Sequence, residues 1–436
     1  MIWNPAAETM PRAERRALQA ERLGVAVRRA AGVPFYRDRL AAVGIDPAAV
    51  RHLEDIEGLP FTRKADFRDL YPYGLLAVPR EQVIRIHASS GTRGKPTLVG
   101  YTRADLEVWR EVMARSLAAA GARPGDLLQN AYGYGLFTGG LGFHDGAEHM
   151  GLTVVPVSSG NTLRQILLLQ DLRPQGLACT PSFALHIGES LREQGVDGAT
   201  LGLRYGVFGA EPWSEELRQE IEALLGLRAI DFYGLSEIVG PGVAVECAEV
   251  RRGLHVSEDH FLPELVGSDG QPLPSGQEGE LVLTTLTKEA LPVIRYRTGD
   301  VTALDTDPCP CGRTTVRMAR IRGRTDDMLV VKGVNVYPSQ VEAALLQLEE
   351  LAPHYQLVVD RREAFPRLEV HVEPSLAQIQ RWGGFDSARG EVAALARRVA
   401  ERLRATLTLG PEVLVVAPKT IPRSEGKAVR VVERTR

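Results

Sequence analysis

The sequence predicts an α/β protein with a large N-terminal α/β domain, built on mostly parallel sheets, and a small C-terminal α+β domain. Its 436 residues exceed one core of ordinary size and suggest two or three units. From about residue 83 to residue 301, short apolar strands alternate with helical stretches, a pattern typical of largely parallel sheets. A turn-rich stretch at residues 303–319 then marks a change to shorter, mixed elements.

Each part has a recognisable order of elements. Residues 11–43 are charged and alanine-rich with helical spacing, so we expect helices that pack on a larger body. In the rest of the N-terminal domain, residues 1–325, we expect strands at 83–86, 152–157 and 205–208 and helices at 104–120 and 215–225. In the C-terminal domain, residues 326–436, we expect strands at 328–331, 356–359, 368–372 and 413–417 and helices at 339–348 and 389–406.

Composition and charge exclude several classes of protein. With 44% hydrophobic and 25% charged residues the chain has globular proportions, which excludes a disordered or coiled-coil chain. With a formal charge of −3, the chain has no overall positive potential that would attract nucleic acid or an anionic membrane. Residues 1–24 carry charges and no apolar signal core, and no later stretch resembles a membrane span. We therefore expect a cytoplasmic protein; its oligomeric state stays open, with a homodimer as one alternative.

One glycine-containing segment has the composition of a phosphate-binding loop. Backbone N–H groups, hydroxyls and a lysine charge can surround phosphate oxygens, and glycine permits close approach. Only six of the 52 basic residues are lysines, so a lysine within such a motif is informative. The flanking residues look extended, so the loop turns between two strands, unlike the strand-to-helix P-loop. The alternative is a turn without ligand. The candidate ligands of phosphate are Ser89, Ser90, Gly91, Thr92, Gly94 and Lys95.

The segment His87–Thr97 resembles the signature loop of the adenylate-forming enzymes, which include acyl-CoA synthetases, adenylation domains and luciferases. With its Gly94–Thr97 ending and the following residues 99–102, it is most similar to the loop of phenylacetate-CoA ligases, and the resemblance extends in order over nearly the whole chain. Lys95 precedes Pro96, which fits this branch, whereas Arg93 stands where a small hydroxyl residue is common. The resemblance implies ATP, Mg²⁺ and coenzyme A as ligands.

Residues 231–237 place an aromatic ring, a glycine, a hydroxyl and a carboxylate at an expected strand end. An aromatic ring can stack on a base, and a carboxylate suits Mg²⁺, which takes hard oxygen ligands. The resemblance implies that Tyr233 lies near adenine and that Glu237 binds the magnesium of ATP. The alternative for a single residue is an ordinary strand-end carboxylate. The other expected nucleotide contacts in this segment are Asp231, Phe232, Gly234 and Ser236.

Three further segments complete the expected nucleotide site. Gly209, Ala210 and Glu211 follow an apolar strand and precede a helix, the position at which α/β sheets bind ligands. The resemblance implies that they touch adenine and the acyl group, although the sequence is also an ordinary helix start. Asp300 ends another strand and can accept hydrogen bonds from both ribose hydroxyls. Arg324 is expected to face ribose or phosphate.

The resemblance implies that the C-terminal domain, residues 326–436, is a mobile lid, and it assigns roles to three of its residues. Asp326 is the hinge, whose backbone dihedrals absorb the rotation of the lid. Gly333 lines the tunnel for the pantetheine arm of coenzyme A, since glycine lets backbone pass close to a ligand. Lys427, on a glycine-flanked loop, is the catalytic residue, because a mobile ammonium can neutralise charge on the carboxylate and α-phosphate. The alternative for Lys427 is a solvated tail lysine.

The cysteines suggest a metal site. Cys247, Cys309 and Cys311 with His255 supply three thiolates and an imidazole, the ligands of a closed tetrahedral zinc site. Some proteins similar to phenylacetate-CoA ligase carry such a site; the alternative is unmetallated cysteines. His260 competes with His255 as the fourth ligand, and Cys179 is expected in the core.

Residues 132–140 mix aromatics with glycines and could form a planar slot for an aryl group, with Tyr134 and Phe137 in the acyl pocket. A strand-helix turn with core aromatics is the alternative.

Together, the motifs and the resemblance predict an ATP-dependent aryl-acid CoA ligase, which forms an acyl-adenylate and pyrophosphate and then transfers the acyl group to coenzyme A. The rival hypotheses are an enzyme that loads a carrier-protein thiol and a non-catalytic sensor of nucleotide or acyl-adenylate.

Overall fold

The described part of the chain forms two compact units. In the computed structural model, the described residues are 1–89, 96–325, 329–331, 334–360, 362, 367–407 and 409–434. The first unit comprises Met1–Cys179, Thr200–Ala210 and Leu227–Arg320; the second comprises Thr180–Ala199, Glu211–Gly226 and Ile321–Arg436. The second unit thus joins the C-terminal part to two segments from the middle of the chain. The domain boundary at residue 325 stays a prediction.

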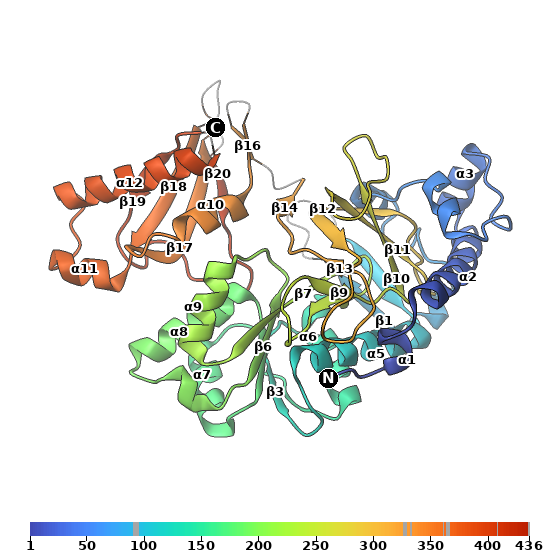
Figure 1. The fold of residues 1–436 in the computed structure, drawn as a ribbon, viewed down its shortest axis with the longest axis horizontal. Coiled ribbons are helices and arrows are strands. Elements are labelled where there is room, and N and C mark those ends of the chain that lie inside the picture. Colours follow the sequence, from blue (N-terminus) through green and yellow to red (C-terminus); the bar gives the residue numbers. More distant parts are fainter. Residues whose placement is uncertain are drawn as a thin grey trace. The chain divides into compact units, whose positions relative to one another are not determined.

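The first unit is built on one large mixed sheet (Figure 1). Along the sheet the strands follow one another in the order β10 (Phe261–Val266), β11 (Glu278–Thr285), β12 (Tyr296–Asp305), β13 (Arg317–Met318), β9 (Leu254–Val256), β8 (Gly240–Glu246), β7 (Arg228–Leu235), β6 (Tyr205–Gly209), β5 (Gly176–Cys179), β3 (Leu127–Asn130) and β4 (Thr153–Val155). From β4 to β7 neighbouring strands are parallel, and from β7 to β10 they are antiparallel. The parallel part confirms the predicted α/β class.

Helices and a separate hairpin complete this unit. The hairpin pairs β1 (Arg85–Ala88) with β2 (Leu98–Tyr101) in antiparallel fashion. The helices at residues 11–43 are present as predicted, and so is the helix expected at 104–120. The helical elements are α1 (Pro5–Glu8), α2 (Arg12–Ala30), α3 (Pro34–Ala42), η1 (Leu53–Gly58), α4 (Lys64–Asp69), η2 (Arg80–Gln82), α5 (Arg103–Ala120), α6 (Thr138–Met150) and α7 (Thr162–Leu172).

Helix α5 shows how the sequence determines both the ends and the buried face of an element. The Thr102 hydroxyl and the Asp105 carboxylate form a capping box at its start, and Gly121 ends it at a positive φ of 102°. Its buried face packs against α6 and β8. On α6, a Cβ atom at Gly146 would lie 2.2 Å from the Cβ of Met113, so the two helices approach this closely only because Gly146 has no side chain.

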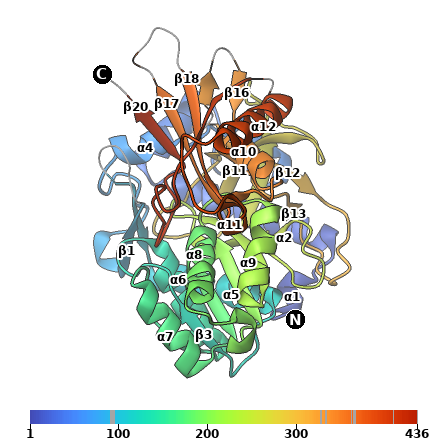
Figure 2. The same ribbon diagram turned by 90° about the vertical axis from the view of Figure 1, so that its left-hand side faces the viewer.

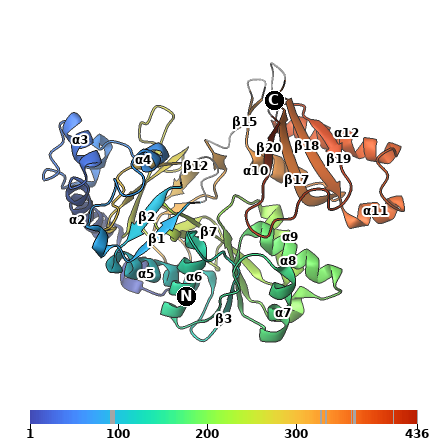
Figure 3. The ribbon, with the colours of Figure 1, turned by 180° about the vertical axis from the view of Figure 1, so that it is seen from behind.

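The second unit contains a four-stranded sheet in the order β19 (Glu412–Val415), β18 (Arg367–Pro374), β17 (Leu351–Asp360), β20 (Val431–Arg434) (Figures 1 and 3). Helix α12 (Gly390–Leu407) buries Leu395, Val399 and Leu403 in a core that also contains residues of β17 and β18. The unit further contains α10 (Pro338–Leu345), α11 (Leu376–Trp382) and the pair β15 (Leu329–Val331) and β16 (Val334–Val336). Helices α8 (Pro181–Glu193) and α9 (Glu215–Leu225) lie side by side in it (Figure 2).

Helix α11 and strand β20 are among the elements of the second unit that were not expected from the sequence. Helix α11 is only 7 residues long and buries no residue, and a segment this short gives little periodic signal. Strand β20 contains two charged residues in four positions and is defined by its parallel pairing with β17. Within the described ranges, no helix combines the length and the apolar sequence that crossing a bilayer requires.

Candidate active site and metal cluster

The predicted phosphate loop joins the two strands of the β1–β2 hairpin. The Ser89 N–H donates to the Thr97 carbonyl at 3.0 Å, which continues the pairing of Ala88 with Leu98 up to the base of the loop. This confirms a turn between strands, in contrast to a strand-to-helix P-loop. The Ser89 hydroxyl is buried and has no hydrogen-bond partner among the described residues. Ser90, Gly91, Thr92, Gly94 and Lys95 lie outside the described residues.

Two predicted nucleotide-binding residues meet across the large sheet. Tyr233 on β7 donates its phenolic hydrogen bond to Asp300 Oδ2 on β12, with 2.5 Å between the two oxygens. Asp300 is buried, and its N–H donates to the Thr298 hydroxyl at 3.0 Å. The fold therefore brings the expected adenine residue and the expected ribose residue, 67 positions apart, into direct contact.

Gly234 is required by the packing of β7 against β8. The register between these strands shifts at Tyr233 and Gly234. A Cβ atom at Gly234 would lie 1.6 Å from the Gly240 carbonyl oxygen, a distance that no side chain can tolerate. The glycine predicted from the sequence thus permits the backbone irregularity that follows Tyr233.

The other predicted nucleotide-binding residues of segment 231–237 contact aromatic, charged and hydroxyl side chains. Phe232 is buried and meets Tyr132 and Phe143 edge-on, with ring centroids 5.9 and 5.0 Å away. The Asp231 carboxylate lies 3.4 Å from Arg320 Nε. Ser236 is buried, with its hydroxyl 3.4 Å from that of Thr138 at the start of α6. Nucleotide contacts of Asp231, Phe232 and Ser236 stay predictions.

Glu237, the predicted magnesium ligand, lies on a turn that a buried lysine holds. Lys288 Nζ donates to the carbonyl oxygens of Glu237 and Ile238, at 3.2 and 2.6 Å. The ammonium also lies 4.8 Å from the centre of the Tyr101 ring. Burial lowers the pKa of Lys288 to about 8, partly offset by the carboxylates of Asp105 and Glu237. A neutral lysine keeps two N–H donors, so both hydrogen bonds can survive deprotonation.

The motifs in the sequence do not predict a role for Lys288, because it lies between Thr287 and Glu289 rather than beside a glycine. The available signal was the scarcity of lysine itself, since arginine supplies most of the surface cations.

The segment expected to bind the aryl group lies against the base of the phosphate loop. The Leu136 carbonyl accepts hydrogen bonds from the Ala88 N–H at 2.8 Å and from His87 Nδ1 at 3.0 Å. The Tyr134 hydroxyl accepts from Asn130 Nδ2 at 2.8 Å, and burial raises the pKa of Tyr134 to about 12. Tyr134 and Phe137 are both half-buried, so each ring retains accessible surface. Their role in the acyl pocket stays a prediction.

The segment at residues 209–211 spans the junction of the two units. Gly209 ends β6, and its N–H donates to the Tyr132 hydroxyl at 3.2 Å. Ala210 has a positive φ of 70°, a strained conformation for a residue with a side chain. In the second unit, Glu211 Oε1 accepts from the Ser182 N–H and Oε2 from the Ala428 N–H, both at 2.8 Å.

The remaining predicted residues belong to the second unit. Lys427 is exposed and lies on the loop between β19 and β20. Arg324 is half-buried in the short strand β14 (Gly323–Arg324). The expected hinge, Asp326, and the expected tunnel residue, Gly333, lie outside the described residues.

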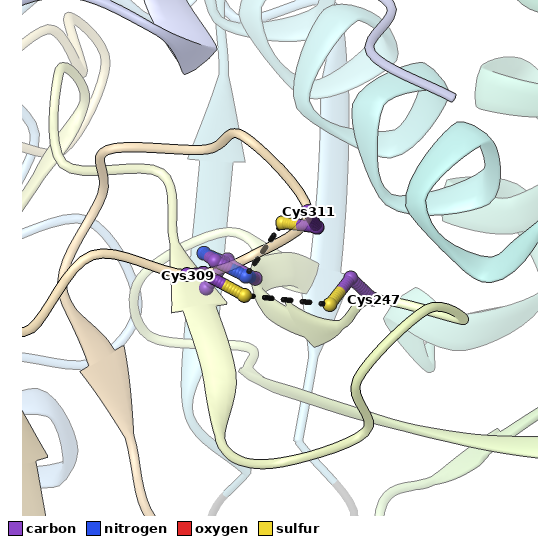
Figure 4. A group of neighbouring side chains, drawn as sticks. Cys247, Cys309 and Cys311 are labelled. Carbon is purple, nitrogen blue, oxygen red and sulfur yellow. Dashed lines mark hydrogen bonds between the residues drawn. The ribbon is translucent and has the colours of Figure 1, made fainter.

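Four side chains form a separate cluster in the first unit (Figure 4). The ligand atoms of Cys247, His255, Cys309 and Cys311 all lie within 4.8 Å of one another. The sulfurs of Cys247 and Cys309 are 3.8 Å apart, and Cys311 Sγ lies 3.4 Å from His255 Nε2. Tetrahedral zinc, with bonds of about 2.3 Å to sulfur and about 2.0 Å to nitrogen, places its ligands about 3.5 to 3.8 Å apart. The described geometry fits a tetrahedral metal.

The surroundings of the cluster favour His255 over His260. His255 directs Nε2 at the cysteines, while its Nδ1 lies 3.0 Å from the Thr315 hydroxyl, which orients the ring. His260 instead contacts Thr287 and Asp259, at 2.9 and 3.1 Å. The Cys247 thiol and the His255 ring lower the pKa of the Cys311 thiol, whereas the Cys311 thiolate and burial raise the pKa of Cys247. Cys179 is buried in β5, as expected of a core residue.

Comparison with known proteins places this geometry in a family. The AMP-binding enzyme family matches residues 75–286, and the AMP-binding enzyme C-terminal domain matches residues 333–435. The phenylacetate-coenzyme A ligase of Thermus thermophilus is 53% identical over 99% of this chain and 99% of its own length. The phenylacetate-coenzyme A ligase of Escherichia coli is 48% identical over 98% of this chain and 96% of its own. The chain belongs to the phenylacetate-CoA ligase family.

Solved structures agree with this assignment. A 2-hydroxyisobutyryl-CoA ligase in its postadenylation state matches with a TM-score of 0.92 at 30% identity, over 99% of this chain and 92% of the other. The same enzyme in its thioesterification state, with coenzyme A, matches with a TM-score of 0.73 over the same shares. As a member of the phenylacetate-CoA ligase family, the chain is an AMP-forming ligase that joins a carboxylic acid to coenzyme A through an acyl-adenylate. This confirms the predicted reaction class.

Replacing Lys288 by methionine should change how stability depends on pH. The pKa of Lys288 in the folded protein, about 8, lies below the ordinary value of 10.5, so between these values the unfolded chain binds more protons. The stability of the natural protein relative to Lys288→Met should therefore be lowest below pH 8 and rise across that window, by about 3 kcal/mol. Urea unfolding of both proteins at about pH 7, 9 and 10 measures this difference.

The matched control for this experiment is Lys64→Met, because Lys64 is an exposed lysine of the same unit. A stability difference between the natural protein and Lys288→Met that stays constant over the three pH values would contradict the assigned pKa.

Proposed function

We propose that this protein is an ATP-dependent phenylacetate-CoA ligase, which converts phenylacetate, ATP and coenzyme A into phenylacetyl-CoA, AMP and pyrophosphate. The observation that carries the proposal is near-full-length similarity to phenylacetate-coenzyme A ligases of four organisms, at 46 to 53% identity. Members of more distant groups, such as a 3-hydroxybenzoate-CoA ligase, match at 27% identity over 66% of the chain. This contrast favours phenylacetate over benzoate-like acids.

The first half-reaction joins the acid to the α-phosphate of ATP. A carboxylate oxygen of the acid forms a bond to the α-phosphorus, the bond to the β-phosphate oxygen breaks, and pyrophosphate leaves. In this step Tyr233 and Asp300 would hold the adenosine, since together they offer an aromatic face beside a carboxylate acceptor. Loop residues 89–95 would hold the phosphates, and Lys427 would neutralise charge that develops in the transition state.

The second half-reaction transfers the acyl group to coenzyme A. The thiol sulfur forms a bond to the acyl carbon, the thiol proton leaves to solvent, and the bond to the AMP oxygen breaks. This step needs no cation at the α-phosphate to expel pyrophosphate, because that group has already left. Lys427 therefore serves the first half-reaction, and residues near Gly333 would guide the pantetheine arm in the second.

Glu237 is suited to a magnesium ion that arrives with ATP. Its carboxylate supplies hard oxygen ligands, and Lys288 holds the backbone of its turn without occupying those oxygens in the described contacts. When bound, Mg²⁺ would neutralise part of the charge of the phosphates.

The cysteine cluster is suited to structural zinc. Cys247 follows β8, His255 lies on β9, and Cys309 and Cys311 lie on the turn between β12 and β13. Four protein ligands leave no open coordination position, which excludes a water-activating role. Zinc there would join the turn to the antiparallel half of the large sheet.

The proposed reaction predicts which acid the protein activates. In a panel of aryl and aliphatic acids, phenylacetate should give the highest kcat/KM for AMP formation, and turnover should require free coenzyme A. An assay for AMP and pyrophosphate, with and without coenzyme A, measures both properties. A preference for an aliphatic or hydroxybenzoic acid would contradict the substrate. Turnover with a carrier-protein thiol but not with coenzyme A would contradict the acceptor.

Replacing Lys427 by alanine should separate the two half-reactions. Adenylation, measured as pyrophosphate release from ATP and phenylacetate, should fall by about 10²- to 10³-fold, because a preorganised charge is lost. Thioester formation from supplied phenylacetyl-adenylate should stay near the natural rate. Lys419→Ala is the matched control, since Lys419 lies on the same stretch of chain and is exposed. Equal loss of both half-reactions would argue against the assigned role.

The zinc proposal predicts different results for two histidines. Protein purified without chelator should contain stoichiometric zinc by elemental analysis, and His255→Gln should lose it, because a ligand is removed. His260→Gln should keep its zinc, because His260 contacts Thr287 and Asp259 instead. Absence of zinc from the natural protein, or its loss in His260→Gln alone, would contradict the site.

A further inference from the structure

The loop that carries Lys427 is held on both sides by side chains from elsewhere in the second unit. The carbonyl of Gly426, the residue before Lys427, accepts a hydrogen bond from the Thr180 hydroxyl at 2.8 Å. The N–H of Ala428, the residue after it, donates to Glu211 Oε2 at 2.8 Å. These partners are 246 and 217 positions away in the chain. Backbone groups are fixed on either side of Lys427 by two independent contacts.

Both side chains that hold the lysine loop also form hydrogen bonds with the first turn of α8. Thr180 is the N-cap of this helix, and its hydroxyl oxygen also accepts from the Phe183 N–H at 3.3 Å. Glu211 Oε1 accepts from the Ser182 N–H at 2.8 Å, so the carboxylate lies where a helix N-terminus favours negative charge. Glu211 thus links the two segments, with Oε1 bound to the start of α8 and Oε2 bound to the loop that carries Lys427. Thr180 and Glu211 form what we call the lysine-loop clamp.

The chemistry of the clamp suits positioning rather than binding of a ligand. Both Glu211 oxygens accept backbone N–H groups, and hydrogen bonds to an ionised acceptor are stronger than neutral ones. A lysine side chain has many rotamers, and if the loop backbone were also mobile, its conformational entropy would be lost as well when the transition state forms. Hydrogen bonds at residues 426 and 428 fix the backbone in advance, so this backbone entropy is not lost during the reaction.

We propose that Glu211 is a positioning residue for the adenylation half-reaction, which it supports by fixing the backbone beside Lys427, with Thr180 as its partner on the other side. This inference rests on the catalytic role proposed above for Lys427. It gives the Glu211 side chain a role different from the nucleotide contact expected from the sequence. The role applies to adenylation alone, because thioester formation does not use Lys427.

Glu211→Gln tests this role, because an amide side chain can accept only one of the two N–H groups. The variant should lower kcat for pyrophosphate release by about 10- to 100-fold, the range for loss of a hydrogen bond to a charged group. The KM values for ATP and phenylacetate should stay within about twofold, since no substrate contact is removed. Thioester formation from supplied phenylacetyl-adenylate should be unchanged. In a Lys427→Ala background, Glu211→Gln should have no further effect on adenylation.

Two further sets of variants guard against a general loss of structure. Glu193→Gln is the matched control, because Glu193 is on α8 and pairs with Lys419 at 2.9 Å, a contact that does not involve residues 426–428. It should leave both half-reactions unchanged. Thr180→Val should lower adenylation, and Thr180→Ser, which keeps the hydroxyl, should restore it. This pair also decides the question if Glu211→Gln folds poorly.

The outcomes distinguish this inference from the proposed function. Equal loss of both half-reactions in Glu211→Gln, or an additional loss in the Lys427→Ala background, would overturn the positioning role. A raised KM for ATP with unchanged kcat would overturn it in favour of a nucleotide contact. If Lys427→Ala loses adenylation and Glu211→Gln does not, the positioning role alone is wrong. If Lys427→Ala keeps adenylation, the role of Lys427 is wrong and the clamp has no catalytic residue to position.

Discussion

Close packing of β7 against β8 is the constraint on which the candidate nucleotide site depends. At Gly234 the backbone of one strand approaches the carbonyl of the other so closely that any side chain would separate them. The register shift that accompanies this approach occurs between Tyr233 and Gly234, immediately before the turn that carries Glu237. The end of β7 thereby presents the Tyr233 ring, which contacts the Asp300 carboxylate of β12, and the Glu237 carboxylate follows on the turn. The glycine serves the geometry of the site rather than the flexibility of a loop.

Buried charge supports this geometry at a cost in stability. Burial of Lys288 lowers its pKa and therefore disfavours its charged form. Its Nζ nevertheless donates hydrogen bonds to the carbonyl oxygens of Glu237 and Ile238 in the turn that carries Glu237. An unpaired buried carbonyl would be costly, so the lysine stabilises a turn that regular strand pairing cannot satisfy. The cysteine cluster is a second example, in which four polarisable side chains are concentrated where a metal would offset their mutual repulsion. In both places a conformation needed locally is stabilised by a group from a distant part of the chain.

The second unit applies the same principle to the lysine loop. A loop rich in small and polar residues has little apolar area with which to fix itself, so hydrogen bonds from Thr180 and Glu211 help to fix its position beside Lys427. The Glu189 carboxylate lies 2.8 Å from His354 Nε2, and Glu193 forms an ion pair with Lys419 on the loop that also carries Lys427. Charged side chains of α8 thus contact C-terminal residues that lie outside the apolar core around α12.

The sequence by itself determined the α/β class, the helices at residues 104–120 and 215–225 and the strand-turn-strand setting of the phosphate loop. These features depend on local periodicity, capping and spacing, which neighbouring residues encode. Only the tertiary structure decided that Tyr233 contacts Asp300, that His255 rather than His260 faces the cysteines, and that Lys288 and Glu211 hold turns far from them in sequence. Such contacts arise when strands and helices pack, and no local pattern specifies which of several similar side chains will meet.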